Sequence, residues 1–289
     1  MGDPLAARVV GGAGRPQTRG VHQATTPLRH EPIGLVADEQ MRLRLELATL
    51  GRQTWGGASG CAGWSAAQVV AHLVAGAELY QRSLGWALAG AAVSPAQAAR
   101  AMENVTECQA RLADQPPSVL LPAFARRGEQ LARSFERLTL ADLDRPAWHP
   151  SGPRTIGSLV ALRVFELGFH GWDVRVASDA RASIRPALRP FLVAFVRQAQ
   201  PRLSRPPAGL SLSGRFEVGD DTWSVAVEHG RVAEVSAGEP VEVGVRTDPS
   251  TFLLLATRRR TLDEVVDRVV LTGESERAAA FVQATSFSV

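Results

Sequence analysis

Two histidines and a glutamate have the residue types and spacing of a metal site. Glu166 and His170 lie four residues apart in the apolar segment from Phe165 to Asp173. In a helix this spacing places both side chains on one face, with roughly 5–6 Å between their Cβ atoms, so both can bind one ion. His72 lies in a second apolar segment and offers a third ligand. Two imidazoles and a carboxylate, with a fourth position open, are the ligand set of a catalytic zinc site.

The polar residues around Glu166 recur at helical spacing along an otherwise apolar helix: Arg163, Glu166, His170 and Asp173. One interpretation makes this stripe the solvent face, with Arg163 and Glu166 forming a surface ion pair of little energetic value. The other interpretation places the polar stripe on the face of the helix that is turned toward the rest of the protein. Arg163 is then a candidate for holding an anionic substrate, because its planar fork suits a carboxylate. Asp173 is a candidate for orienting His170, although it can equally be a hydrogen bonder at the end of the helix.

The elements that must position these ligands are helices. Ser65 and Gln68 have the Ser-x-x-Gln spacing of a capping box, which predicts a helix that begins at Ser65 and carries His72 two turns later. A single histidine on an apolar helix is more often a core residue with one hydrogen-bond partner than a metal ligand. A second helix that carries Glu166 and His170 is the partner such a ligand needs, and bundle cores build metal sites from facing helices.

Hydrophobic periodicity divides the chain into two folded regions. Residues 1–33 are rich in Gly, Pro, Arg and Thr, which predicts a disordered tail. A helical period predicts a bundle over residues 34–200, followed by a proline-rich linker over 201–208. Residues 209–289 alternate with a period of two and predict a small α+β domain. The expected fold class is therefore a helical bundle followed by an α+β domain.

The C-terminal region shows no cluster of catalytic residues. Glu228 and His229 stand beside a turn at Gly230 and are expected at the surface. We therefore expect this region to act as a lid, as a wall of the substrate pocket or as an interface.

Composition excludes several reaction classes. The 289 residues include no lysine, so Schiff-base, pyridoxal-phosphate and P-loop lysine chemistry are ruled out. The formal charge is only +3, and the arginines are scattered among acids, so nucleic-acid binding is not expected. No apolar run reaches the roughly 18 residues that cross a bilayer, and no secretory signal opens the sequence. With two unpaired cysteines, Cys61 and Cys108, we expect a cytoplasmic protein without membrane association.

The segments from Gly63 to His72 and from Glu166 to Asp173 resemble the mycothiol-dependent maleylpyruvate isomerase family. The resemblance implies a DinB-like four-helix bundle with an extra helix and a sterol-carrier-like C-terminal domain. It implies that His72, Glu166 and His170 bind zinc or another divalent metal, with mycothiol as the thiol cosubstrate. It also implicates an arginine on the helix between the ligands. The matching segment here is Arg100-Ala-Met-Glu, where the family more often has Asn after the arginine.

The residues and the resemblance together predict a zinc- and thiol-dependent enzyme. It would add or transfer mycothiol to a small, anionic electrophile, as an S-transferase or as a cis-trans isomerase. Two alternatives stay open: a zinc hydrolase that activates water, and a non-catalytic protein that binds a lipid or another small molecule. Thiol-dependent turnover separates the first two functions, and metal content separates both from the third.

Overall fold

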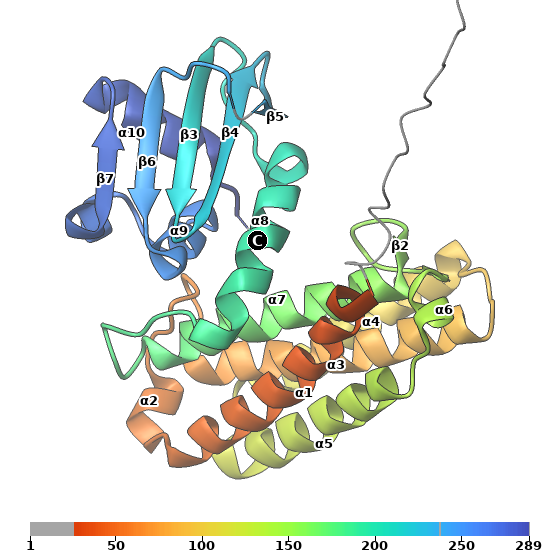
Figure 1. The fold of residues 1–289 in the computed structure, drawn as a ribbon. Coiled ribbons are helices and arrows are strands. Elements are labelled where there is room, and N and C mark those ends of the chain that lie inside the picture. Colours follow the sequence, from red (N-terminus) through yellow and green to blue (C-terminus); the bar gives the residue numbers. More distant parts are fainter. Residues whose placement is uncertain (1–25, 237, 289) are drawn as a thin grey trace, which may run out of the picture.

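The structure is a computed structural model that describes residues 26–236 and 238–288, and it consists of a helical bundle and a sheet-containing domain (Figure 1). Most of the tail predicted over residues 1–33 lies outside the described residues. The prediction is wrong for residues 26–33, because the first helix already begins at Thr26. Among the described residues, no helix is long and apolar enough to cross a membrane.

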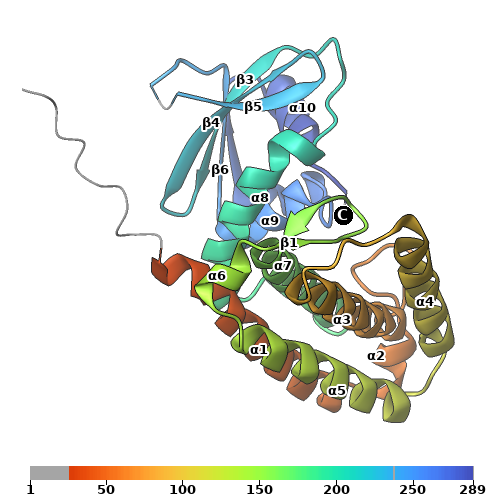
Figure 2. The same cartoon turned by 90° about the vertical axis from the view of Figure 1, so that its right-hand side faces the viewer.

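The N-terminal region is a four-helix bundle with an extra helix, as expected. The four long helices are α1 (Thr26–Thr49), α3 (Ala66–Leu88), α5 (Pro117–Glu136) and α7 (Ile156–Arg175). The extra helix α4 (Pro95–Ala113) packs on the outside of α3 (Figure 2). The capping box at Ser65 is present: its side chain accepts from the backbone N–H of Gln68, and the Gln68 side chain accepts from the backbone N–H of Ser65. Local sequence thus determines where α3 begins.

Several short elements of the bundle have no clear signal in the sequence: α2 (Arg52–Gly56), α6 (Leu140–Leu143), β1 (Pro146–Ala147) and β2 (Arg154–Thr155). Strands β1 and β2 pair antiparallel. The loop between them rests on the C-terminal half of α3, where the Ser83 hydroxyl donates a hydrogen bond to the carbonyl of Trp148. This contact brings residues 148–153 toward the face of α3 that carries His72.

The connection between the two domains is packed rather than free. A short 3₁₀ helix, η1 (Pro186–Leu188), leads into α8 (Arg189–Leu203), so the linker predicted to begin at Pro201 starts later than expected. The backbone N–H of Ser204 donates to the carbonyl of Gln200 at 3.0 Å, and the Ser204 hydroxyl donates to the carbonyl of Thr285 at 2.9 Å. These bonds hold the last turn of α8 despite the missing N–H of Pro201.

The C-terminal region is the small α+β domain that the period-two pattern predicts. Its five strands are β3 (Leu212–Val218), β4 (Asp221–Glu228), β5 (Arg231–Val235), β6 (Val243–Thr247) and β7 (Val269–Thr272). They form one sheet in the order β5-β4-β3-β6-β7, in which the β3–β6 pair is parallel and the other pairs are antiparallel. The helical elements are α9 (Pro249–Ala256), the 3₁₀ helix η2 (Asp263–Arg268) and α10 (Ser275–Thr285), and α10 packs against β3 and β6 (Figure 1).

An aromatic cluster fills the space between the sheet and its helices. The ring centroid of Phe216 lies 5.1 Å from that of Trp223, 5.4 Å from that of Phe252 and 5.0 Å from that of Phe281. Gly214 permits this packing, because a Cβ atom there would lie only 2.4 Å from the Phe281 ring. As expected, Glu228 and His229 are exposed at the turn between β4 and β5. The domain is thus built around an apolar core.

Candidate metal centre

Helices α3 and α7 bring His72, Glu166 and His170 together. The Nε2 atom of His72 lies 3.1 Å from Oε2 of Glu166, and the Nε2 atom of His170 lies 3.4 Å from the same oxygen. One ligand atom from each residue lies within 4.8 Å of the other two. The side chains of His72 and Glu166 are 30% and 28% exposed, so solvent reaches one side of the group. The arrangement therefore offers three converging donors and one open side.

These donors fit a divalent metal ion. Two imidazole nitrogens and a carboxylate oxygen suit zinc and leave a fourth position for a substrate. Burial raises the pKa of Glu166, but hydrogen bonds from His170 and His72 outweigh burial and hold it well below its usual value. Glu166 is therefore ionised, which is the form that binds a metal.

Asp173 orients one of the imidazoles. Its Oδ2 atom lies 2.8 Å from Nδ1 of His170, and its side chain is fully buried. Burial lowers the pKa of His170, but hydrogen bonds with Asp173 and Glu166 outweigh burial and raise it. Because Nδ1 donates to Asp173, Nε2 is left to face Glu166 and the open side. A carboxylate behind a ligating histidine also makes the imidazole a stronger ligand.

The C-terminal domain contributes an arginine that sequence reasoning missed. Arg259 follows α9 and binds Asp173 with two hydrogen bonds, Nε to Oδ1 at 3.0 Å and Nη2 to Oδ2 at 2.9 Å. Its Cζ atom also lies 4.8 Å from the ring centroid of Phe169. The only sequence signal is the run from Arg258 to Arg260, which carries no information about a partner 86 residues away. Arg259 thus links the second domain to His170 through Asp173.

The loop between α2 and α3 closes over the end of α7. The backbone N–H of Gly60 donates to the carbonyl of Asp173 at 2.8 Å. A Cβ atom at Gly60 would lie 2.6 Å from the Trp172 ring, so only glycine allows this approach. Cys61 follows in the loop, and burial together with the charge of Asp173 raises the pKa of its thiol. A protonated thiol is a poor nucleophile, so Cys61 is not an activated cysteine.

Helix α4 also reaches the metal centre, through Gln109. Its Oε1 atom lies 3.5 Å from Nδ1 of His72, on the side of the ring away from Glu166. The edge of the Trp64 indole approaches the same imidazole, with 5.4 Å between ring centroids. The sequence gives no sign of the Gln109 contact, because it depends on how α4 packs against α3.

The two arginines proposed from the sequence as anion holders lie elsewhere. Arg163 is only 1% exposed, and it donates to the carbonyl of Leu73 at 3.2 Å and to Oε1 of Gln40 at 3.4 Å. Its guanidinium is thus used inside the bundle rather than presented to a substrate. Arg100 is exposed on α4 and precedes Gln109 by nine residues, about two and a half helical turns. It therefore lies on the opposite face of α4 from the residue that meets His72.

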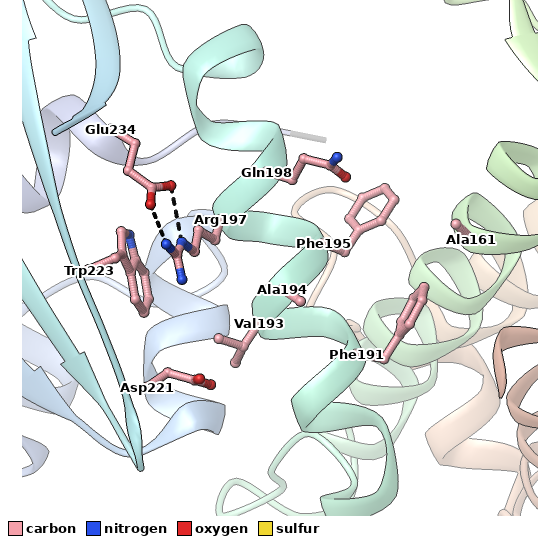
Figure 3. A pocket seen from close by; sticks show the side chains of 10 residues that line it. All are labelled: Ala161, Phe191, Val193, Ala194, Phe195, Arg197, Gln198, Asp221, Trp223 and Glu234. Carbon is pink, nitrogen blue, oxygen red and sulfur yellow. Dashed lines mark hydrogen bonds and ion pairs between the residues drawn. The ribbon is translucent and has the colours of Figure 1, made fainter. Parts of the chain in front are cut away.

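A cavity of about 580 Å³ at the junction of the domains is separate from the metal centre (Figure 3). Phe191 and Phe195 project from α8 on its α7 side, and Arg197 projects toward the sheet, where its Nε lies 3.2 Å from Oε2 of Glu234. The Arg197 guanidinium also lies 5.3 Å from the ring centroid of Trp223. The described residues that line this cavity include no histidine or cysteine, so it does not offer metal or thiol chemistry.

The fold and the site together define a DinB-like helical bundle that carries a two-histidine, one-glutamate centre and is followed by a mixed-sheet domain. Residues 36–175 match the family model described as the mycothiol maleylpyruvate isomerase N-terminal domain. The helical bundle of this chain belongs to that family, which confirms the resemblance seen in the sequence.

Solved structures of the mycothiol-dependent maleylpyruvate isomerase support the same fold. The crystal structure of the mycothiol-dependent maleylpyruvate isomerase is 17% identical, covers 86% of this chain and 95% of its own, and superimposes with a TM-score of 0.61. A single-residue mutant of that isomerase gives the same values. YfiT from Bacillus subtilis, described as a probable metal-dependent hydrolase with an unusual four-helix bundle topology, is 15% identical over 56% of this chain and 92% of its own, with a TM-score of 0.43. No curated protein matches the chain.

Proposed function

We propose that this protein is a metal-dependent enzyme, most simply a zinc enzyme, that adds mycothiol or a similar low-molecular-weight thiol to a small unsaturated electrophile. The observation that carries the proposal is the convergence of His72, Glu166 and His170 on one point with a solvent-accessible side. The membership of the bundle in the mycothiol maleylpyruvate isomerase family supports the choice of thiol and of an isomerase.

The residues of this chain prepare the site in a defined way. Glu166 supplies an ionised carboxylate, and His72 and His170 each present Nε2 toward it. Asp173 and Arg259 hold His170 in that orientation from behind. A zinc ion bound by these three ligands would supply a positive charge that lowers the pKa of a coordinated thiol. A thiol coordinated in this way would be a thiolate at neutral pH, whereas a free alkyl thiol is only a few per cent ionised.

The fate of the added sulfur decides the class of reaction. When the thiolate forms a C–S bond to a conjugated double bond, the π electron pair moves to the adjoining carbonyl, and the former double bond becomes free to rotate. Elimination of the thiolate after rotation restores the double bond and regenerates the thiol, which is a cis-trans isomerisation. A product that keeps the sulfur makes the protein an S-transferase. The family of the bundle favours the isomerase.

The C-terminal domain is proposed to act by positioning. Arg259 comes from this domain and reaches the metal centre only through Asp173. The five-stranded sheet and its aromatic cluster bear no ligand of the proposed metal. The domain thus supplies a wall and a fixed charge, and the bundle supplies the ligands.

The test is turnover by the full-length, metal-loaded protein. Unsaturated dicarboxylic acids are offered with mycothiol, with glutathione, with cysteine and with no thiol, and the metal content of the same preparation is measured. We expect about one zinc per chain and product only when a thiol is present. Metal-dependent turnover that is undiminished without thiol would instead identify a hydrolase. A preparation with no metal and no turnover would favour a binding protein.

A further inference from the structure

The face of α3 that carries His72 continues toward a buried tyrosine. Gly76 and Tyr80 follow His72 at intervals of four residues, so the three lie on one face of the helix. Helical side chains lean toward the N-terminus of their helix, which directs the Tyr80 ring toward Gly76 and the metal centre. Gly76 is partly exposed and has no side chain, and the nearest neighbour of a Cβ atom there would be Nη1 of Arg163 at 3.7 Å. The surface between His72 and Tyr80 is therefore open.

His149 lies against Tyr80, with 5.9 Å between ring centroids. Within the loop that joins β1 to β2, Arg154 donates from Nη2 to the Ser151 hydroxyl at 2.8 Å. That hydroxyl lies 2.8 Å from Nδ1 of His149, and the backbone N–H of Ser151 donates to the same nitrogen at 3.2 Å. Because Nδ1 accepts hydrogen bonds, the proton of the neutral ring resides on Nε2. The loop thus presents His149 as a donor.

The two donors have no partner in the part of the chain that the structure describes. Neither Nε2 of His149 nor the hydroxyl of Tyr80 forms a hydrogen bond there, although the Tyr80 side chain is only 3% exposed. The Tyr80 hydroxyl is not among the fully buried side-chain atoms that lack a partner, so its oxygen reaches the protein surface, where a ligand or a water molecule can bind it. The pair therefore offers two adjacent, unused donors.

Electrostatics connects this pair to the metal centre. Burial raises the pKa of Tyr80, and the negative charge of Glu166 raises it further. Burial and the charge of Arg154 lower the pKa of His149, whereas Glu166 opposes that shift. Both side chains are thus neutral donors at neutral pH. The charges of Glu166 and Arg154 act on both side chains, and the charge of Arg163 also acts on Tyr80.

We infer that Tyr80 and His149 bind the carboxylate or carbonyl oxygen of the electrophile, with Arg154 as the balancing positive charge. The inference rests on the proposed function and assigns two substrate-binding residues to it. During addition, sulfur bonds to the β-carbon and the π electron pair moves onto this oxygen, where the two donors stabilise the developing charge. His149 also lines a cavity of about 350 Å³ that has Trp86 and Trp148 in its wall.

Binding of succinate, an unreactive dicarboxylate, to the metal-loaded full-length protein tests the site without requiring turnover. We expect Tyr80→Phe and His149→Ala each to weaken succinate binding by about tenfold or more, since each removes one hydrogen bond to a charged group. His149→Gln keeps a donor amide and should recover part of the affinity. His229→Ala, at an exposed turn of the other domain, is the matched control and should bind as the native protein does. Metal content should be unchanged in all four variants.

A blocking variant provides a second, independent test. Gly76→Leu places a side chain between His72 and Tyr80, whereas Gly85→Leu places the same side chain at an exposed position of the same helix with no neighbour within 4 Å. We expect only the Gly76 variant to lose succinate binding while it keeps its metal. Normal succinate affinity in Tyr80→Phe, His149→Ala and Gly76→Leu would overturn the inference.

Turnover distinguishes this inference from the proposed function. With an unsaturated acid and thiol, the Tyr80 and His149 variants should lose kcat while the KM for thiol stays constant. One outcome is that succinate binding depends on Tyr80 and His149 while the protein shows no thiol-dependent turnover. This result would support the anion site and reject the proposed thiol chemistry. Thiol-dependent turnover of an unsaturated acid that neither substitution affects would support the proposed thiol chemistry and reject the anion site.

Discussion

Helix α7 contributes to two clusters of charged side chains that differ in their partners. The candidate metal centre sets one carboxylate, Glu166, between two imidazoles and leaves a side open. The second cluster, which we name the α1 ion cluster, joins α1 to the end of α7 and to the segment before α8. It consists of Glu39, Glu46, Arg175 and Arg185. Both clusters are wholly or partly buried, so burial does not distinguish a metal site from a structural one.

The chemistry of the partners makes the difference. In the α1 ion cluster each carboxylate faces an arginine, as in the 3.3 Å contact between Nη1 of Arg175 and Oε2 of Glu46. A guanidinium stays protonated and has no lone pair to offer a metal ion. A neutral imidazole has such a lone pair. His72 and His170 therefore add two donors beside the Glu166 carboxylate, whereas an arginine there would only neutralise its charge. The comparison teaches that the type of partner, rather than the number of charges, decides whether a cluster offers donors to a metal ion.

Removal of a metal ligand should have the largest effect. We expect His170→Gln or His72→Gln to reduce zinc affinity by more than about 100-fold, because a direct ligand is worth more than its outer hydrogen-bond partner. Turnover should fall to background. Elemental analysis measures the metal, and far-UV circular dichroism should show an intact bundle. His229→Gln is the control, and full metal retention in both ligand variants would disprove the assignment.

Disruption of the contact between the domains should have the second-largest effect. Arg259→Met removes both hydrogen bonds to Asp173, and we expect zinc affinity or activity to fall by about 10- to 100-fold. Arg260→Met is a matched control, because Arg260 lies over the ring of Trp172 and makes no contact with Asp173. Zinc competition titrations measure the difference. Equal zinc affinities of the Arg259→Met and Arg260→Met variants would show that Arg259 has no positioning role.

Acidification should release the metal through His170, whose pKa is raised above the ordinary 6.5. Because protons compete with the metal for Nε2, zinc affinity should fall as the pH drops through that raised value. In the metal-free protein, the stability linked to His170 is fully present below pH 6.5 and is lost as the pH rises through the raised pKa. Asp173→Asn should lower zinc affinity at neutral pH and, because it removes a group that raises the pKa of His170, shift the pH dependence of that affinity to lower pH. A release midpoint that this substitution leaves unchanged, in zinc titrations between acidic and neutral pH, would contradict the mechanism.

The α1 ion cluster should influence stability and leave the metal unaffected. Burial raises the pKa of Glu39 from 4.5 to about 7, although Arg185 opposes the shift. Nε of Arg185 lies 3.0 Å from Oε1 of Glu39 without hydrogen-bond alignment, which is consistent with burial outweighing the pairing. Stability linked to Glu39 is thus present below pH 4.5 and is lost as the pH rises through about 7.

This shift corresponds to at most roughly 3 kcal/mol of unfolding free energy. Glu39→Gln should therefore remove part of the decline in stability between acidic and neutral pH, as measured by denaturant unfolding at several pH values, with zinc binding unchanged. The same pH dependence in the variant and the native protein would show that Glu39 titrates normally.

The sequence predicts the helices of this protein well, because their signals are local. The capping residues at Ser65 and Ser94 set the beginnings of α3 and α4, and both capping boxes are present. The sequence gives no clear signal for the short strand β7, whose four residues alternate between intermediate and exposed positions at the edge of the sheet. The proline at residue 201 suggested a linker, but hydrogen bonds to Thr285 extend α8 beyond it. Long-range bonds therefore overrode a local signal.

For the site, the sequence by itself determined that Glu166 and His170 share one face, because helix geometry converts their spacing of four residues into that arrangement. It also determined that Asp173 falls one turn beyond His170. Only the tertiary structure decided that Arg163 is buried, that Arg259 from the other domain holds Asp173, and that Tyr80 and His149 form a pair. These contacts join residues far apart in the chain, and their geometry depends on how helices and domains pack, which no local spacing encodes.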